Sequence, residues 1–216
     1  MHMCVALVLW INTVYNYCCA TLKSPGRLPA SDSVPSDVSP DKYCDPCKTL
    51  KRSHAHHCRD CKACVPYLDH HCPFTMNCVG RDNFHYFFLF LAYVSAGLAY
   101  SAWLTFPLIR MCWLDFVAPT HHYVCQLLGN MSLICIASVG LWLCTTCLCA
   151  IQVGQLLLDW STLASIKFLQ TDCSLATLRA RLGQARFRNP DSRLHVLLLS
   201  RRPRLWHWFI PFTEPQ

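Results

Sequence analysis

The chain has 216 residues, of which 53% are hydrophobic and only 14% are charged. Soluble domains usually carry about 25% charged residues, so this composition argues against an ordinary cytosolic enzyme and excludes a disordered or collagen-like chain. The formal net charge is +7. Because the hydrophobic residues occur in long blocks, this positive charge favours loops facing anionic lipid headgroups over nucleic-acid binding.

Three stretches contain no Asp, Glu, Lys or Arg, namely residues 1–22, 84–109 and 124–158. A helix crosses a bilayer with about 20 apolar residues, so the second stretch predicts a transmembrane helix and the third contains another. The first stretch is apolar only from Met3 to Tyr15. It lacks the basic start and the small-residue cleavage site of a signal peptide, so we interpret it as a further transmembrane helix, truncated at its start.

Lys and Arg residues predict how these helices are oriented. Segments 23–83 and 160–216 hold nine each, whereas segment 110–123 holds only Arg110. The positive-inside rule therefore predicts a cytosolic segment 23–83, a luminal loop 110–123 and a cytosolic tail 159–216. Residues 24–41 are rich in Pro, Ser and Asp, which is typical of an irregular linker.

Cysteine and histidine are concentrated in the predicted cytosolic segment. Seven of the 17 cysteines lie between Cys44 and Cys78. Cytosolic thiols stay reduced, so this density indicates metal binding before disulfides. A structural Zn²⁺ site takes four tetrahedral nitrogen or sulfur ligands. Two sites need eight ligands, which six Cys and two His can supply. One of the seven Cys then remains unused, and spacing alone does not say which Cys it is.

Cys72 is the best candidate for the unused thiol, because it directly follows Asp69, His70 and His71. A neutral imidazole can accept the thiol proton, and Asp69 can fix its tautomer and stabilise the imidazolium. The alternative is a purely structural zinc module that binds protein or nucleic acid. Because membrane helices flank the segment on both sides, we expect no nucleic-acid partner.

The sequence from Cys44 to Phe87 resembles the cysteine-rich domain of the DHHC protein S-acyltransferases (palmitoyltransferases). The string C-x2-C-x9-HC-x2-C-x2-C-x4-DHHC-x5-C-x4-N-x3-F matches it at every spacing. The resemblance implies an all-α polytopic membrane protein with an irregular, zinc-stabilised cytosolic Cys-rich domain. Three transmembrane helices are visible, where the family usually has four or more.

The resemblance also assigns roles to matching residues. Two structural Zn²⁺ ions would each take three thiols and one imidazole: Cys44, Cys47, His57 and Cys64 for the first ion, and Cys58, Cys61, His71 and Cys78 for the second. Cys72 would be the acyl-accepting nucleophile, His70 its general base and Asp69 the residue that orients His70. Phe74 stands where the family commonly has Trp and would lie against the acyl chain.

The reaction implied by the family is protein S-palmitoylation. A long-chain acyl group would pass from palmitoyl-CoA, or a similar acyl-CoA, to Cys72 and then to a Cys of a membrane-associated or transmembrane protein. Lys51 and Arg52 are candidate contacts for the CoA phosphates, although such a basic run is also typical of a surface facing solvent and headgroups. The resemblance to this family implies that the protein is located in the Golgi or endoplasmic reticulum membrane. An inactive zinc-stabilised scaffold that binds client proteins is the alternative.

Overall fold

The computed structural model describes residues 1–30, 43–51, 54–115 and 129–171. Three long helices dominate these residues: α1 His2–Leu22, α2 Phe84–Asp115 and α4 Gly129–Leu157. A short helix, α5 Thr162–Thr171, follows α4. Most of the predicted C-terminal tail, from residue 172 onward, and residues 116–123 of the predicted luminal loop lie outside the described residues.

Each long helix contains a segment that is long and apolar enough to cross a membrane: His2–Leu22, Phe84–Pro107 and Leu133–Leu157. Large apolar side chains are exposed along them, including Trp10 on α1, Trp103 on α2 and Leu141 on α4. In water such surfaces would be unfavourable, whereas lipid is their natural solvent. The predicted class, a polytopic helical membrane protein with a separate Cys-rich domain, is confirmed.

Helix α2 is longer than the apolar stretch that predicted it. It continues to Asp115, so residues 110–115 of the predicted luminal loop are helical. These residues contain neither Gly nor Pro, and a helix does not need to stop where its apolar surface ends. Composition therefore located the apolar span and not the end of the helix.

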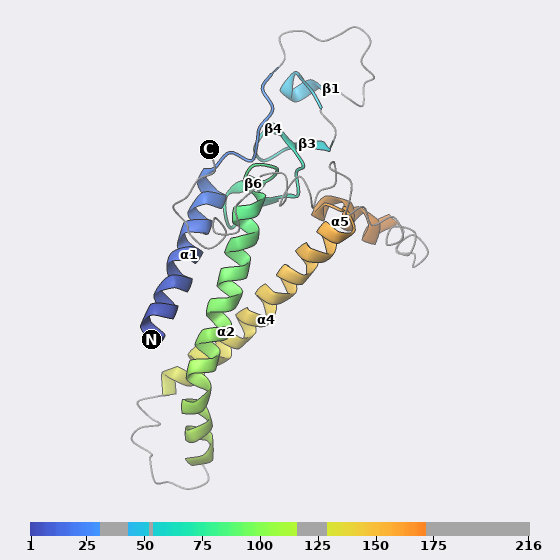
Figure 1. Cartoon of the computed structure of the whole chain (residues 1–216). Coiled ribbons are helices and arrows are strands. Elements are labelled where there is room, and N and C mark those ends of the chain that lie inside the picture. The colour runs from blue at the N-terminus through green and yellow to red at the C-terminus, as the bar shows by residue number, and fades with distance from the viewer. Residues whose placement is uncertain (31–42, 52–53, 116–128, 172–216) are drawn as a thin grey trace.

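Helix α2 packs against both α1 and α4, as Figure 1 shows. Polar side chains join α2 to α4, because the hydroxyls of Ser95 and Thr146 lie 2.7 Å apart. On α1, buried Asn12 and Asn16 donate to backbone carbonyls of the preceding turn. These four polar side chains thus find partners within the protein, as hydrocarbon surroundings require.

The Cys-rich domain lies between α1 and α2 in sequence and was expected to be irregular. The described residues instead form three antiparallel two-stranded hairpins. Their elements are β1 Tyr43–Cys44, the 3₁₀ turn η2 Asp45–Cys47, β2 Thr49–Leu50, β3 Ala55–Cys58, β4 Ala63–Pro66, β5 His70–Cys72 and β6 Asn77–Val79. Strands of two to four residues are too short to show an alternating hydrophobic pattern, which is why the sequence did not predict them.

Two buried asparagines join this domain to the end of α1. The last carbonyls of a helix have no partner within it. The amide of Asn77 donates to the carbonyls of Ala20, Thr21 and Lys23 over 2.9–3.2 Å. The amide of Asn83 also donates to Ala20, over 3.1 Å. The domain therefore caps α1, and its β6 strand lies beside the end of that helix (Figure 1).

A glycine allows the chain leaving α1 to approach the domain closely. A Cβ atom on Gly80 would lie 2.4 Å from Val65 Cγ1 and 2.7 Å from the Pro25 carbonyl oxygen. Further along, the Leu28 amide donates to the Cys64 carbonyl over 2.8 Å. The segment after α1 is thus fastened along the Cys-rich domain and keeps the two parts in a fixed relation.

Candidate functional site

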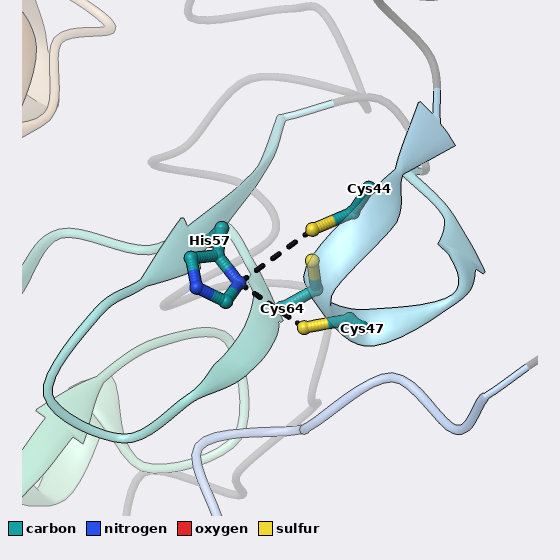
Figure 2. Close-up of side chains that lie close together, drawn as sticks. All are labelled: Cys44, Cys47, His57 and Cys64. Atoms are coloured by element: carbon teal, nitrogen blue, oxygen red, sulfur yellow. Dashed lines mark hydrogen bonds between the residues drawn. The ribbon is translucent and has the colours of Figure 1, made fainter.

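The first metal-binding group combines residues from two hairpins. Cys44 and Cys47 come from β1 and η2, while His57 and Cys64 face each other across the β3–β4 ladder. Figure 2 shows the three sulfur atoms gathered around the His57 ring. His57 Nδ1 lies 3.1 Å from Cys47 Sγ and 3.6 Å from Cys44 Sγ.

The second group repeats this arrangement. His71 and Cys78 face each other across the β5–β6 ladder, and Cys58 and Cys61 come from the end of β3 and the turn after it. His71 Nδ1 lies 3.4 Å from Cys61 Sγ and 3.8 Å from both Cys58 Sγ and Cys78 Sγ. In each group the four candidate ligand atoms lie within 4.8 Å of one another.

Strand geometry explains why neighbouring residues belong to different groups. Successive side chains of a strand point to opposite faces. On β3, His57 therefore turns to the first group and Cys58 to the second. In both Cys-x2-Cys turns the next residue, Lys48 or Lys62, has a positive φ of 48° or 49°, which reverses the chain after the second thiol.

Both groups fit Zn²⁺. In a tetrahedral site with Zn–S bonds of about 2.3 Å and Zn–N bonds of about 2.0 Å, ligand atoms lie roughly 3.5–3.8 Å apart. The separations of 3.1–3.8 Å found here are close to that. Burial, followed by hydrogen bonds with Cys44 and Cys47, raises the pKa of the Cys64 thiol, and a cation at the centre would offset that cost. With four protein ligands each, such sites would be closed and structural.

Cys72 alone among the thiols between residues 43 and 79 lies outside both groups. On β5, His70 and Cys72 share one face, while His71 points to the opposite face and the second group. Asp69 Oδ2 accepts a hydrogen bond from His70 Nδ1 over 2.9 Å. The structure therefore brings Asp69, His70 and Cys72 together in the order expected for a carboxylate, an imidazole and a thiol acting in series.

The surroundings of Cys72 favour its thiolate. Burial raises the pKa of Cys72, but hydrogen bonds from His70, Thr75 and nearby backbone amides lower it more strongly, to about 7. Burial lowers the pKa of His70, but hydrogen bonds to Asp69 and Cys72 raise it to about 9. Near neutral pH the arrangement therefore approaches a thiolate–imidazolium pair, the reactive form of a nucleophilic cysteine.

Sequence reasoning missed two residues that hold Asp69, which is 1% exposed. Thr162, the first residue of α5, donates to Asp69 from its hydroxyl over 2.6 Å and from its backbone amide over 3.1 Å. Gln152 of α4 donates from its amide over 3.4 Å. A polar Gln in the apolar stretch and the Ser-Thr pair after it were the signals available, since Ser and Thr favour helix starts.

Of the residues expected to contact the co-substrate, Phe74 and Lys51 are described, and the backbone of Phe74 lies beside Cys72. Phe74 is 83% exposed and does not belong to the hydrophobic cluster around Cys72. That cluster combines Ala20 of α1, Phe87 of α2 and Leu156 of α4 with Cys72. Lys51 lies near Cys44. Arg52 lies outside the described residues.

Parts of this sequence are similar to those of known proteins. A family model described as DHHC palmitoyltransferase matches residues 37–168. Among curated proteins, Palmitoyltransferase ZDHHC15 of Xenopus laevis is 39% identical over 74 residues, which are 34% of this chain and 22% of the relative. Palmitoyltransferase ZDHHC2 of Rattus norvegicus is 50% identical over 52 residues, 24% of this chain and 14% of the relative. Palmitoyltransferase PFA4 of Yarrowia lipolytica is 31% identical over 129 residues, 57% of this chain and 34% of the relative.

These matches span no more than about a third of each of these curated relatives. The family model, however, covers more than half of the chain and includes the Cys-rich domain, α2, α4 and the start of α5. The chain belongs to the DHHC palmitoyltransferase family.

Proposed function

We propose that this protein is a protein-cysteine S-acyltransferase whose acyl carrier is Cys72. One observation supports the proposal above all: the thiol outside both metal-binding groups lies beside an imidazole held by a buried carboxylate. The thiols of the metal-binding groups would be closed to substrates when zinc is bound, so only one nucleophile of the domain stays available. The similar curated proteins are named palmitoyltransferases, which agrees with transfer of an acyl group.

The reaction would proceed in two transfers. The Cys72 thiolate attacks the thioester carbonyl carbon of a long-chain acyl-CoA such as palmitoyl-CoA; a new carbon–sulfur bond forms and the bond to the CoA sulfur breaks. His70 gives its proton to the departing CoA thiolate. A substrate thiol then loses its proton to His70 and attacks the Cys72 thioester, which returns the Cys72 thiolate.

The two proposed zinc ions would take no part in these transfers. Each would hold a hairpin: the first β3–β4, through His57 and Cys64, and the second β5–β6, through His71 and Cys78. Because His70 and Cys72 flank His71, fixing the His71 ring would also fix the strand that presents them.

The acyl chain would lie among the membrane helices while CoA remains in water. The cluster around Cys72 already contains side chains of α1, α2 and α4. Deeper along α1 and α2 is a cavity of about 430 Å³, whose lining includes Leu9, Trp10, Tyr93 and Leu98. The positive-inside rule supports a cytosolic Cys-rich domain. Substrates would be membrane-associated or transmembrane proteins, and the Golgi or endoplasmic reticulum membrane would be the site of action.

Replacing the nucleophile tests the proposal. We expect purified Cys72→Ser protein in liposomes to form no hydroxylamine-sensitive acyl-enzyme with palmitoyl-CoA, while the unmodified chain forms one acyl group per molecule and releases CoA. The variant should still bind two zinc ions, because Cys72 belongs to neither group. Zinc-loaded unmodified protein that never releases CoA would refute the enzyme and favour the scaffold alternative.

A further inference from the structure

The loop between β5 and β6 surrounds the sulfur of Cys72 with hydrogen-bond donors. Residues 73–76 follow Cys72, the last paired position of β5. Pro73 has no N–H group, so the first amides after Cys72 belong to Phe74 and Thr75. Both amides donate to Cys72 Sγ. Ser, Thr, Asp and Asn side chains accept from the same two amide positions when they cap a helix, but here the accepting atom is a sulfur.

Thr75 adds a third donor from the inner side of the loop. Its side chain is 1% exposed, and its hydroxyl lies 3.4 Å from the Cys72 carbonyl oxygen and also hydrogen-bonds to Cys72 Sγ. A hydroxyl has a single proton, so it can donate fully to only one of these two acceptors at a time. Because hydrogen bonds to charged acceptors are the stronger ones, the proton turns to the neighbour that carries negative charge.

These donors differ in kind from His70. The His70 ring also hydrogen-bonds to Cys72 Sγ, but in the proposed reaction it gives up and takes back its proton. The Thr75 hydroxyl and the two loop amides keep their protons. They are also held in place, since Thr75 is buried and paired strands flank the loop on both sides. Such preorganised donors suit the stabilisation of a charge that develops during a reaction.

Thioester chemistry moves negative charge away from the sulfur. When a thiolate adds to a thioester carbonyl, a carbon–sulfur bond forms and the carbonyl oxygen takes the electron pair of its π bond. This oxygen and the attacking sulfur are then attached to the same carbon atom. Donors gathered at Cys72 Sγ are therefore close to the new oxyanion. When the adduct collapses, the carbonyl forms again and the bond to the leaving sulfur breaks.

We propose that Thr75 is a catalytic residue whose hydroxyl, together with the amides of Phe74 and Thr75, stabilises this oxyanion. The hydroxyl proton follows the charge from Cys72 Sγ to the thioester oxygen. The proposal rests on the proposed function for its natural substrate, an acyl-CoA, whereas the donors around Cys72 are part of the fold. Removal of one such donor from a protease lowers kcat by about 10²–10³-fold, and because two amides remain here, we expect a loss of about tenfold or more.

Two reactions of the same sulfur test the proposal. Phenyl thioacetate acetylates Cys72 through an oxyanion, whereas iodoacetamide alkylates it without one. Mass spectrometry of the peptide that contains Cys72 measures both rates on the zinc-loaded full chain in detergent. Thr75→Val removes the hydroxyl and keeps the shape of the side chain, and Thr75→Ser retains a hydroxyl. Thr49→Val is the matched control, because Thr49 is also buried in the Cys-rich domain and donates to the Pro29 carbonyl over 2.7 Å.

We expect Thr75→Val to slow acetylation of Cys72 by about tenfold or more, and to slow alkylation at least fivefold less than that. Thr75→Ser should keep most of the acetylation rate, and Thr49→Val should leave the ratio of the two rates unchanged. Thr75→Ala replaces Thr75→Val if the valine variant loses its zinc. Equal losses in both reactions would mean that Thr75 only positions the sulfur, and would overturn the proposal, as would no loss at all.

The same proteins separate this proposal from the proposed function. Phenyl thioacetate needs no acyl-CoA site, so its reaction reports on the donors around Cys72 alone. If acetylation depends on Thr75 but palmitoyl-CoA forms no acyl-enzyme with the unmodified chain, the transferase fails and the oxyanion site stands. If palmitoyl-CoA acylates the unmodified chain and Thr75→Val equally fast, the transferase stands and the catalytic role of Thr75 is wrong.

Discussion

At the scale of single residues, the candidate site depends on which face of a short strand each side chain occupies. His70 and Cys72 are two residues apart and lie on one face of β5, whereas His71 between them faces the second metal-binding group. Asp69 then fixes the His70 ring through Nδ1 and leaves Nε2 for the thiol. In the proposed mechanism, these three neighbouring side chains would divide proton transfer, nucleophilic attack and metal binding among themselves.

Asp69→Asn tests the orienting carboxylate. An amide can accept from His70 Nδ1 only through its oxygen and does not stabilise the imidazolium, so we expect acyl-enzyme formation to slow by about 100-fold or more. Single-turnover labelling with palmitoyl-CoA measures this rate. Arg59→Ala, an exposed change in the same domain, is the control. A loss below about threefold in Asp69→Asn would show that the carboxylate does not orient the base.

At the same scale, Asn77 links the hairpin of Cys72 to α1. Asn77→Ala removes an amide NH2 group whose two hydrogens are shared among three carbonyls at the end of that helix, and we expect the protein to lose about 1–3 kcal/mol of stability. Thermal unfolding in detergent, followed by intrinsic fluorescence, should show a lower Tm. An unchanged Tm would mean that other contacts hold α1 on the domain.

At the scale of elements, α4 and α5 reach back to a residue about ninety positions earlier. Gln152 and Thr162 both donate to Asp69, and the Thr162 hydroxyl also lies 3.1 Å from Gln155 Oε1. A membrane helix and the helix that follows it thereby position a carboxylate of the Cys-rich domain. In the proposed mechanism Gln152 and Thr162 would act through Asp69, which would make both positioning residues.

A double-mutant cycle separates positioning from general stabilisation. We expect Gln152→Leu and Thr162→Val each to slow acyl-enzyme formation by about 5–30-fold, which corresponds to roughly 1–2 kcal/mol of lost transition-state stabilisation. In an Asp69→Asn background, neither change should slow it much further, because the positioned carboxylate is already absent. Ser138→Ala, a buried polar change elsewhere on α4, is the control. If the rate losses of the two single variants multiply fully in the double variants with Asp69→Asn, the positioning role of Gln152 and Thr162 is contradicted.

The two groups of candidate metal ligands could be predicted from the sequence, whereas the contacts that hold Asp69 could not, for a physical reason. Metal chemistry restricts ligand types and spacing, so Cys44, Cys47 and the later pairs could be recognised from the chain alone. Asp69–Thr162 is a long-range contact that no local pattern encodes. The hairpins were missed because strands of two to four residues are too short to show hydrophobic alternation. The contact of Phe74 with the acyl chain stays a prediction, because a residue type does not reveal which way a loop turns its side chain.

At the scale of the whole molecule, one cluster unites membrane helices and Cys-rich domain. It contains Ala20 of α1, Phe84 and Leu91 of α2, Leu156 of α4, and Cys72 with Val79 of the β5–β6 hairpin. The domain is therefore packed directly onto the helices and does not hang from a flexible tether. The helices and the hairpin should consequently respond together when either is disturbed.

Zinc stoichiometry tests the proposed division of ligands. We expect the unmodified chain to hold two zinc ions by elemental analysis, Cys64→Ser and Cys78→Ser to hold about one, and Cys72→Ser to hold two. Because β3 supplies His57 to one group and Cys58 to the other, each single-ligand variant should also bind its remaining ion more weakly against a chelator. Loss of zinc from Cys72→Ser would contradict the assignment of a free thiol.

The alternation along β5 has a consequence for how this chain can vary over evolutionary time. Insertion or deletion of one residue just before His71 would exchange the two faces of the strand and turn the thiol toward the metal group. Point substitutions can change the site in small steps. A change of length in β5 exchanges both faces of the strand in one step. Lineages that carry this hairpin should therefore almost never gain or lose residues between positions 69 and 78.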